Sequence, residues 1–277
     1  MNPIQRVIGV DFSGAKLAGQ NIWVAQVAID GDRLNLEALD SLETLCGTSE
    51  RAGALAWLVE FIREQQDTLV AIDFPFGLPV ELGWRTWPEQ LGAVATWAEG
   101  ANEFGRECVR RARLLGDKMH IRRQTDQETK TPFDCYHYRI IYQTFHGMRD
   151  VMLPLAKEPR VAVAPFSPAT KLTEVVVVEA CPGSSLKRWK LPHNNYKQPT
   201  GGELTDKRVA TRQTLMRFLK SRVELTRSQQ SKMMLNPGGD AFDSVIAAVG
   251  SLEAFLNSDL SHDVNHARYP YEGKVYS

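Results

Sequence analysis

Short apolar runs that end in an acid recur along this chain and constrain its fold more than any other feature. Asp11 ends the run RVIGVD, Asp73 ends TLVAID, and Glu179 lies near the end of EVVVVEA. Apolar runs of this length are typical of buried strands. A carboxylate is costly to bury without a partner, and open α/β sheets present their chemistry at strand ends. The pattern therefore predicts adjacent strands whose acids share one site.

The rest of the chain predicts an α/β fold that begins with three antiparallel strands, over residues 6–12, 21–29 and 33–40. Asp30-Gly31 separates the second and third runs and is a strong hairpin signal, because that turn needs positive φ angles. Helical periodicity over residues 42–66 precedes the strand at 68–73. We expect one domain over residues 1–277 with a helical insertion at 84–159, a basic helix at 206–223, a last helix at 240–256 and a loosely ordered tail from residue 258.

Composition excludes several classes of protein. The chain has 277 residues, 43% of them hydrophobic, and its 33 basic residues balance 33 acidic ones. This balance argues against a disordered chain and against a protein that coats nucleic acid. Aliphatic runs such as Val175–Val178 are far shorter than the ~18 apolar residues of a membrane span. The chain is therefore not expected to bind a membrane. Four cysteines without paired spacing indicate a reduced, cytoplasmic protein.

The last predicted helix adds two further acids, Asp240 and Asp243, in its first turn and on one face. Glycines and a proline before Asp240 place it near the N-cap, whereas Asp243 lies one turn further on beside the apolar face. Oxygen ligands of this kind suit Mg(II) or Mn(II). Two such ions roughly 4 Å apart can support phosphodiester cleavage. Each acid taken alone also fits a cap, a turn or an ion pair.

Four sequence blocks carry a family resemblance: VIGVDFSGAK, VAIDFPFGLP, VVVVEACPGSSL and GGDAFDSVIAAV. They resemble the signature blocks of the domain-of-unknown-function 429 family, a group of predicted ribonuclease H-like nucleases. The resemblance implies a ribonuclease H-like mixed sheet, three antiparallel strands followed by parallel ones, flanked by helices. It also implies a metal-dependent nuclease in which Asp11, Asp73, Glu179 and Asp243 are catalytic and hold two Mg(II) or Mn(II) ions, with Asp240 as an alternate ligand.

Basic residues supply candidate contacts to a nucleic-acid substrate. Arg208, Arg212 and Lys220 belong to a stretch with eight basic residues and one acid, and Ser13 and Lys16 follow the first strand in a small-residue turn. Such a turn is also similar to the first phosphate loop of the actin and sugar-kinase superfamily, whose backbone amides hold phosphates. These residues do not distinguish RNA, DNA and a branched junction as the substrate. The sequence does not specify an oligomeric state either.

The sequence also allows two other functions. A nucleic-acid-binding or regulatory protein could keep the same fold and acids without turnover. A phosphotransferase of the actin and sugar-kinase kind is less favoured, because the chain has one core and no convincing second phosphate loop.

Overall fold

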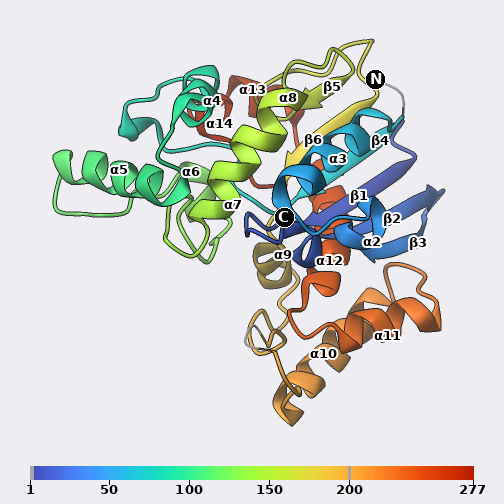
Figure 1. Cartoon of the computed structure of the whole chain (residues 1–277). Helices are drawn as coiled ribbons and strands as arrows, with labels where there is room; N and C mark the ends of the chain where they lie inside the picture. Colours follow the sequence, from blue (N-terminus) through green and yellow to red (C-terminus); the bar gives the residue numbers. More distant parts are fainter. Residues whose placement is uncertain (1–2, 199–200) are drawn as a thin grey trace.

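The centre of the molecule is a mixed β-sheet. The computed structural model describes residues 3–198 and 201–277, and within them six strands pair in the order β3-β2-β1-β4-β6-β5 (Figure 1). The strands are β1 (Arg6–Asp11), β2 (Trp23–Asp30), β3 (Arg33–Ser41), β4 (Thr68–Ile72), β5 (Val161–Val163) and β6 (Val175–Glu179). β1, β2 and β3 pair antiparallel, whereas β1, β4, β6 and β5 run parallel. The predicted change from antiparallel to parallel pairing is confirmed, while β5, three residues long, was not anticipated.

Helices occupy most of the remaining described chain. Their bounds are α1 (Ala18–Asn21), α2 (Leu42–Cys46), α3 (Arg51–Arg63), η1 (Val80–Leu82), α4 (Trp87–Thr96), α5 (Ala101–Leu114), α6 (Gln124–Glu128), α7 (Ile141–His146), η2 (Gly147–Met152), α8 (Leu153–Leu155), α9 (Pro182–Arg188), α10 (Asp206–Leu219), α11 (Arg227–Leu235), α12 (Asp240–Leu256), α13 (Leu260–Asn265) and α14 (Tyr269–Glu272). In the part of the chain that the structure describes, none of them has the length and apolar character needed to cross a bilayer.

Alternation along the strands divides the core between the two faces of the sheet. Ile8 and Val10 of β1 pack with α3 and with helices of the insertion, whereas Val7 faces the opposite layer, which contains α12. Successive side chains of a strand point to opposite faces, so one apolar run supplies both layers. Each face is therefore covered by helices, as expected for the buried parallel part of a sheet.

The helical insertion leaves the sheet after β4 and returns at β5. It contains α4 to α8, and Figure 1 shows α5 projecting away from the sheet. Its last part is helical without interruption from Ile141 to Leu155, as α7, η2 and α8 in direct succession, with η2 a π-helical segment. The polar segment between α5 and α7 contains the short helix α6.

The polar tail packs onto the sheet, so the expectation that it is loosely ordered is wrong. Tyr276 is fully buried, and its amide donates to the carbonyl of Glu179 at 2.8 Å. Val275 forms a parallel bridge with Glu179 and donates its amide to Thr125 Oγ1 at 2.8 Å. The last residues thus extend the hydrogen bonding at the end of β6, a long-range contact that the polarity of the tail does not reveal.

Candidate functional site

Three of the predicted acids converge at one end of the sheet. Asp11 ends β1, Asp73 directly follows β4, and Asp243 lies in the first turn of α12. One carboxylate oxygen of each lies within 4.8 Å of the corresponding oxygens of the other two. Asp11 and Asp243 are buried and Asp73 is half-buried. We call Asp11, Asp73 and Asp243 the acidic triad.

Strand pairing and one glycine bring the triad together. β1 and β4 are parallel with Val10 opposite Ile72, so the residues that follow emerge at the same edge. α12 crosses β1 so closely that a Cβ on Gly9 would lie 1.9 Å from the carbonyl oxygen of Ser244. Only glycine permits that approach without displacing the helix. It sets the first turn of α12, with Asp243, against the end of β1.

The segment that follows α9 supplies polar partners for Asp243. Tyr196 is buried and its hydroxyl donates to Asp243 Oδ1 at 2.8 Å, while the Lys197 ammonium forms an ion pair with the other oxygen. Neither residue is predicted from the sequence, because both lie in a polar, aperiodic loop. An isolated tyrosine among polar neighbours was the one available signal.

Arg208 and Arg212, both predicted to contact phosphate, donate hydrogen bonds to the backbone of this loop. Arg212 is fully buried, and its guanidinium donates to the carbonyl of Tyr196 at 2.7 Å; it also bonds the carbonyls of Met233, Met234 and Pro237. The prediction that Arg212 binds phosphate is therefore wrong, because backbone oxygens surround its charge. Arg208 Nε similarly donates to the carbonyl of Lys197 at 2.7 Å, although Arg208 also lines the cavity described below.

The triad lies in a cavity with a volume of about 960 Å³, which we call the acidic cavity. Ser13, Asp240 and Glu179 also line it, as do the basic residues Arg139, Lys187 and Arg208. Lys16 and Lys220 are exposed and are not among its lining residues. Negative charge is concentrated on the triad, with positive side chains at other points of the wall.

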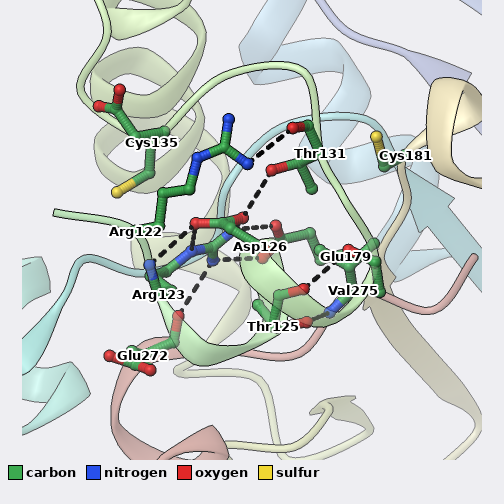
Figure 2. Close-up of polar contacts among 12 residues, drawn as sticks. Arg122, Arg123, Thr125, Asp126, Thr131, Cys135, Glu179, Cys181, Glu272 and Val275 are labelled. Carbon is green, nitrogen blue, oxygen red and sulfur yellow. Dashed lines mark hydrogen bonds and ion pairs between the residues drawn. The ribbon is translucent and has the colours of Figure 1, made fainter. Parts of the chain in front are cut away.

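Glu179 is held by an arginine and does not join the triad. Arg123 donates to both of its carboxylate oxygens, at 2.5 and 2.8 Å (Figure 2). The amide of Phe76 donates to one of these oxygens at 2.9 Å. Arg123 also bonds both oxygens of Asp126 and the carbonyl of Glu272. Arg123 and both acids are almost fully buried. Glu179 thus shares the cavity wall, but its carboxylate is paired with Arg123, which it shares with Asp126.

Asp240 is the first residue of α12 and therefore does not occupy the N-cap position. Gly239 is the N-cap residue, with φ of 84°, and no side chain caps from that position. Asn236 Oδ1 instead accepts the amide of Ala241 at 3.3 Å, so the expected capping role of Asp240 is wrong. The Asp240 side chain is half-buried, lines the acidic cavity and accepts a long bond of 3.4 Å from Asn236.

The carboxylates are crowded enough to alter their protonation. Burial raises the pKa of Asp11 well above its usual range; repulsion from Asp243, Asp240 and Asp73 adds to this rise, and Lys197 opposes it. Burial, followed by repulsion from Asp243, raises the pKa of Asp73 to about 7. Burial also raises the pKa of Asp240. One lysine does not compensate these acids, which is the electrostatic condition that favours a bound cation.

Comparisons of the chain with protein-family models, with curated proteins and with solved structures found no match.

Proposed function

We propose that this protein is a divalent-metal-dependent nuclease with a ribonuclease H-like fold. The observation that carries the proposal is the convergence of Asp11, Asp73 and Asp243 within 4.8 Å in a cavity of about 960 Å³. Its support from topology is a mixed sheet in which three antiparallel strands are followed by parallel ones, as the sequence resemblance implies, together with the acid-bearing helix α12.

The triad fits a hard divalent cation. All its donors are carboxylate oxygens, which suit Mg(II) or Mn(II). The fold holds these acids close together, and their burial and mutual repulsion raise the pKa of Asp11 and of Asp73. Asp240 lines the same cavity and is the candidate for a second ion. A bound divalent cation would polarise a phosphodiester and lower the pKa of water, the chemistry that hydrolysis of this bond requires.

The chain's own residues prepare this site in two ways. Tyr196 and Lys197 hold the Asp243 carboxylate from one side, and Arg208 and Arg212 hold the backbone carbonyls of that loop. Ligands positioned by neighbouring hydrogen bonds lose little freedom when a metal binds. Basic residues of the cavity wall attract phosphate and would orient the backbone of a nucleic acid toward the triad.

A cleavage assay tests the proposal. Fluorescently labelled single-stranded and duplex DNA and RNA are incubated with the protein in Mg(II), in Mn(II) and in EDTA. We expect cleavage with metal alone, and a loss of about a hundredfold or more in Asp11→Asn, because even residues that only support metal ligands contribute 10–100-fold. Asp32→Asn is the matched control, since Asp32 is exposed at the β2–β3 turn.

Two results would contradict the proposal. Cleavage that persists in EDTA or in Asp11→Asn would come from another site or another protein. Binding of nucleic acid without cleavage under any metal condition would favour the binding or regulatory alternative.

Metal affinity should depend on pH through Asp73. A metal binds the deprotonated carboxylate, and the pKa of Asp73 is raised from 3.8 to about 7. The apparent affinity for Mg(II) should therefore be about tenfold weaker at pH 6 than at pH 8, following the deprotonated fraction of one such group. Isothermal calorimetry at both pH values measures it, and an affinity that does not change would contradict the raised pKa.

The stability of the metal-free protein should decrease as the pH rises, whereas the affinity for metal should increase. Between pH 4 and 7 the folded state holds a proton on Asp73 that the unfolded state has lost, so stability in EDTA should fall as the pH rises through this window. Above about pH 7 Asp73 is deprotonated in both states, so its own contribution to this fall should level off. Thermal unfolding in EDTA at several pH values provides the check.

A further inference from the structure

A second cavity lies on the helical insertion, next to the acidic cavity. Its volume is about 570 Å³, and its wall includes three arginines of α5, Arg106, Arg110 and Arg113, together with Tyr136, Tyr138 and Ile141. No acidic residue is among those that line it, although Arg106 and Arg110 pair with Glu103 and Glu107 elsewhere on α5. A wall with apolar and aromatic surface and basic charge suits a ligand with flat apolar groups and anionic links between them.

The two cavities share a wall of four consecutive residues. Tyr138 and Ile141 line the second cavity, whereas Arg139 and Ile140 line the acidic cavity. A ligand that leaves the acidic cavity over Arg139 thus reaches the second cavity within the width of one short segment. This one segment, residues 138–141, therefore separates the two cavities.

Aromatic rings connect the two cavities. Phe133 lines the acidic cavity and stacks on His137 with ring centroids 4.7 Å apart, and His137 in turn lies 4.5 Å from Tyr138. The Arg139 guanidinium lies 5.6 and 5.8 Å from the ring centroids of Phe133 and Tyr138. Tyr138 is 72% exposed, so its ring is available to a ligand. Aromatic rings interleaved with arginine are typical of surfaces that bind unpaired bases.

We propose that this surface binds a single strand of nucleic acid, whose unpaired bases stack on Tyr138 in the second cavity while the backbone continues into the acidic cavity. The direction of the strand rests on the proposed nuclease function, whereas the stacking site does not. A duplex is excluded as the preferred ligand because its bases are already stacked and turned inward. Among the described residues, Arg113 has no acidic partner, and its recorded side-chain contact is the sulfur of Met119, so its charge is free for a phosphate.

Binding of labelled 12-nucleotide oligomers in EDTA tests the proposal without cleavage. Fluorescence anisotropy is measured with oligo-dT, with oligo-U and with a DNA duplex of the same length. We expect either single strand to bind about tenfold or more tightly than the duplex. Comparison of the two single strands shows whether a 2′-hydroxyl contributes. A duplex that binds as tightly as the single strands would overturn the proposal.

Tyr138→Ala should weaken single-strand binding about fivefold or more, the effect of losing one stacked base. Tyr142→Ala is the matched control: Tyr142 is 46% exposed on α7 and is not among the residues that line either cavity. Circular dichroism verifies that both variants fold. Equal affinities for the two variants would exclude Tyr138 as a stacking site.

A charge control separates a local phosphate contact from general attraction. Arg113→Gln should flatten the dependence of log Kd on log salt by about 0.7 for a single strand. Lys118→Gln removes a charge from the neighbouring exposed loop, and Lys118 does not line the cavity. Equal changes in the two variants would mean that Arg113 acts only through overall charge.

The binding and cleavage results are independent. If Tyr138 proves necessary for binding and no cleavage occurs with metal, the single-strand site stands and the nuclease function fails. If cleavage depends on Asp11 but Tyr138→Ala binds normally, the nuclease function stands and the stacking site is wrong.

Discussion

Replacing Asp243 by asparagine should abolish metal-dependent cleavage while the protein stays folded. Asp243 is 1% exposed, shares the triad with Asp11 and Asp73, and is the triad member that joins it to Tyr196 and Lys197. Asparagine retains an oxygen that can accept the Tyr196 hydroxyl, but it loses the charge that a hard cation requires. We expect cleavage to fall by about a hundredfold or more, because loss of a ligand exceeds the 10–100-fold effect of a supporting residue.

Thermal unfolding separates this effect from misfolding. The neutral side chain relieves repulsion with Asp11 and Asp73 and leaves Lys197, which is half-buried, to be hydrated. The melting temperature of Asp243→Asn in EDTA should therefore stay close to that of the natural sequence, while the rise on adding Mg(II) should disappear. A variant that unfolds in EDTA would assign Asp243 a structural role in place of a metal-binding one.

Asp240→Asn is the internal comparison. Asp240 lies outside the triad and is half-buried, and the helix cap beside it is provided by Asn236. We expect a smaller loss of activity than in Asp243→Asn, overcome by a higher concentration of Mg(II), because the residue serves a second, weaker ion. Complete loss in Asp240→Asn with normal activity in Asp243→Asn would reverse the assignment of the two acids.

Replacing Arg123 by methionine should strongly destabilise the protein. Arg123 is 1% exposed and pairs with the carboxylates of both Asp126 and Glu179 (Figure 2). Its removal leaves two buried acids without a compensating charge, for which a loss of about 3–5 kcal/mol is expected. Urea unfolding measures it. Arg122→Met is the matched control, since Arg122 is exposed and the change should stay within about 0.5 kcal/mol.

A rescue variant identifies the cause of the loss. Adding Asp126→Asn and Glu179→Gln to Arg123→Met removes both uncompensated charges and should recover a large part of the stability, since neutral replacements of a buried ion network are often tolerated. Loss of the same size in Arg122→Met and Arg123→Met would show that the buried network contributes little. Failure of the triple variant to recover would point to lost packing of the arginine instead.

The sequence determined by itself the elements whose signals are local. Alternation and apolar runs located β1 to β4 and β6, and Asp30-Gly31 located the hairpin, because side-chain period and turn geometry depend on neighbouring residues. The position of acids at strand ends also indicated two members of the triad, Asp11 and Asp73, although it included Glu179 as well. Parallel pairing brings such ends to one edge, so the meeting of Asp11 and Asp73 follows from the strand pattern.

Only the tertiary structure decided which charges face one another. Glu179 ends its strand as Asp11 does, yet Arg123, 56 residues earlier in the chain, takes both of its oxygens. Arg212 belongs to a basic helix like Arg208, but it points into carbonyl oxygens from segments up to 25 residues away. A strand pattern specifies which face or end a side chain occupies. Its partner is specified by segments that reach that place only on folding, and ion pairing carries no sequence period.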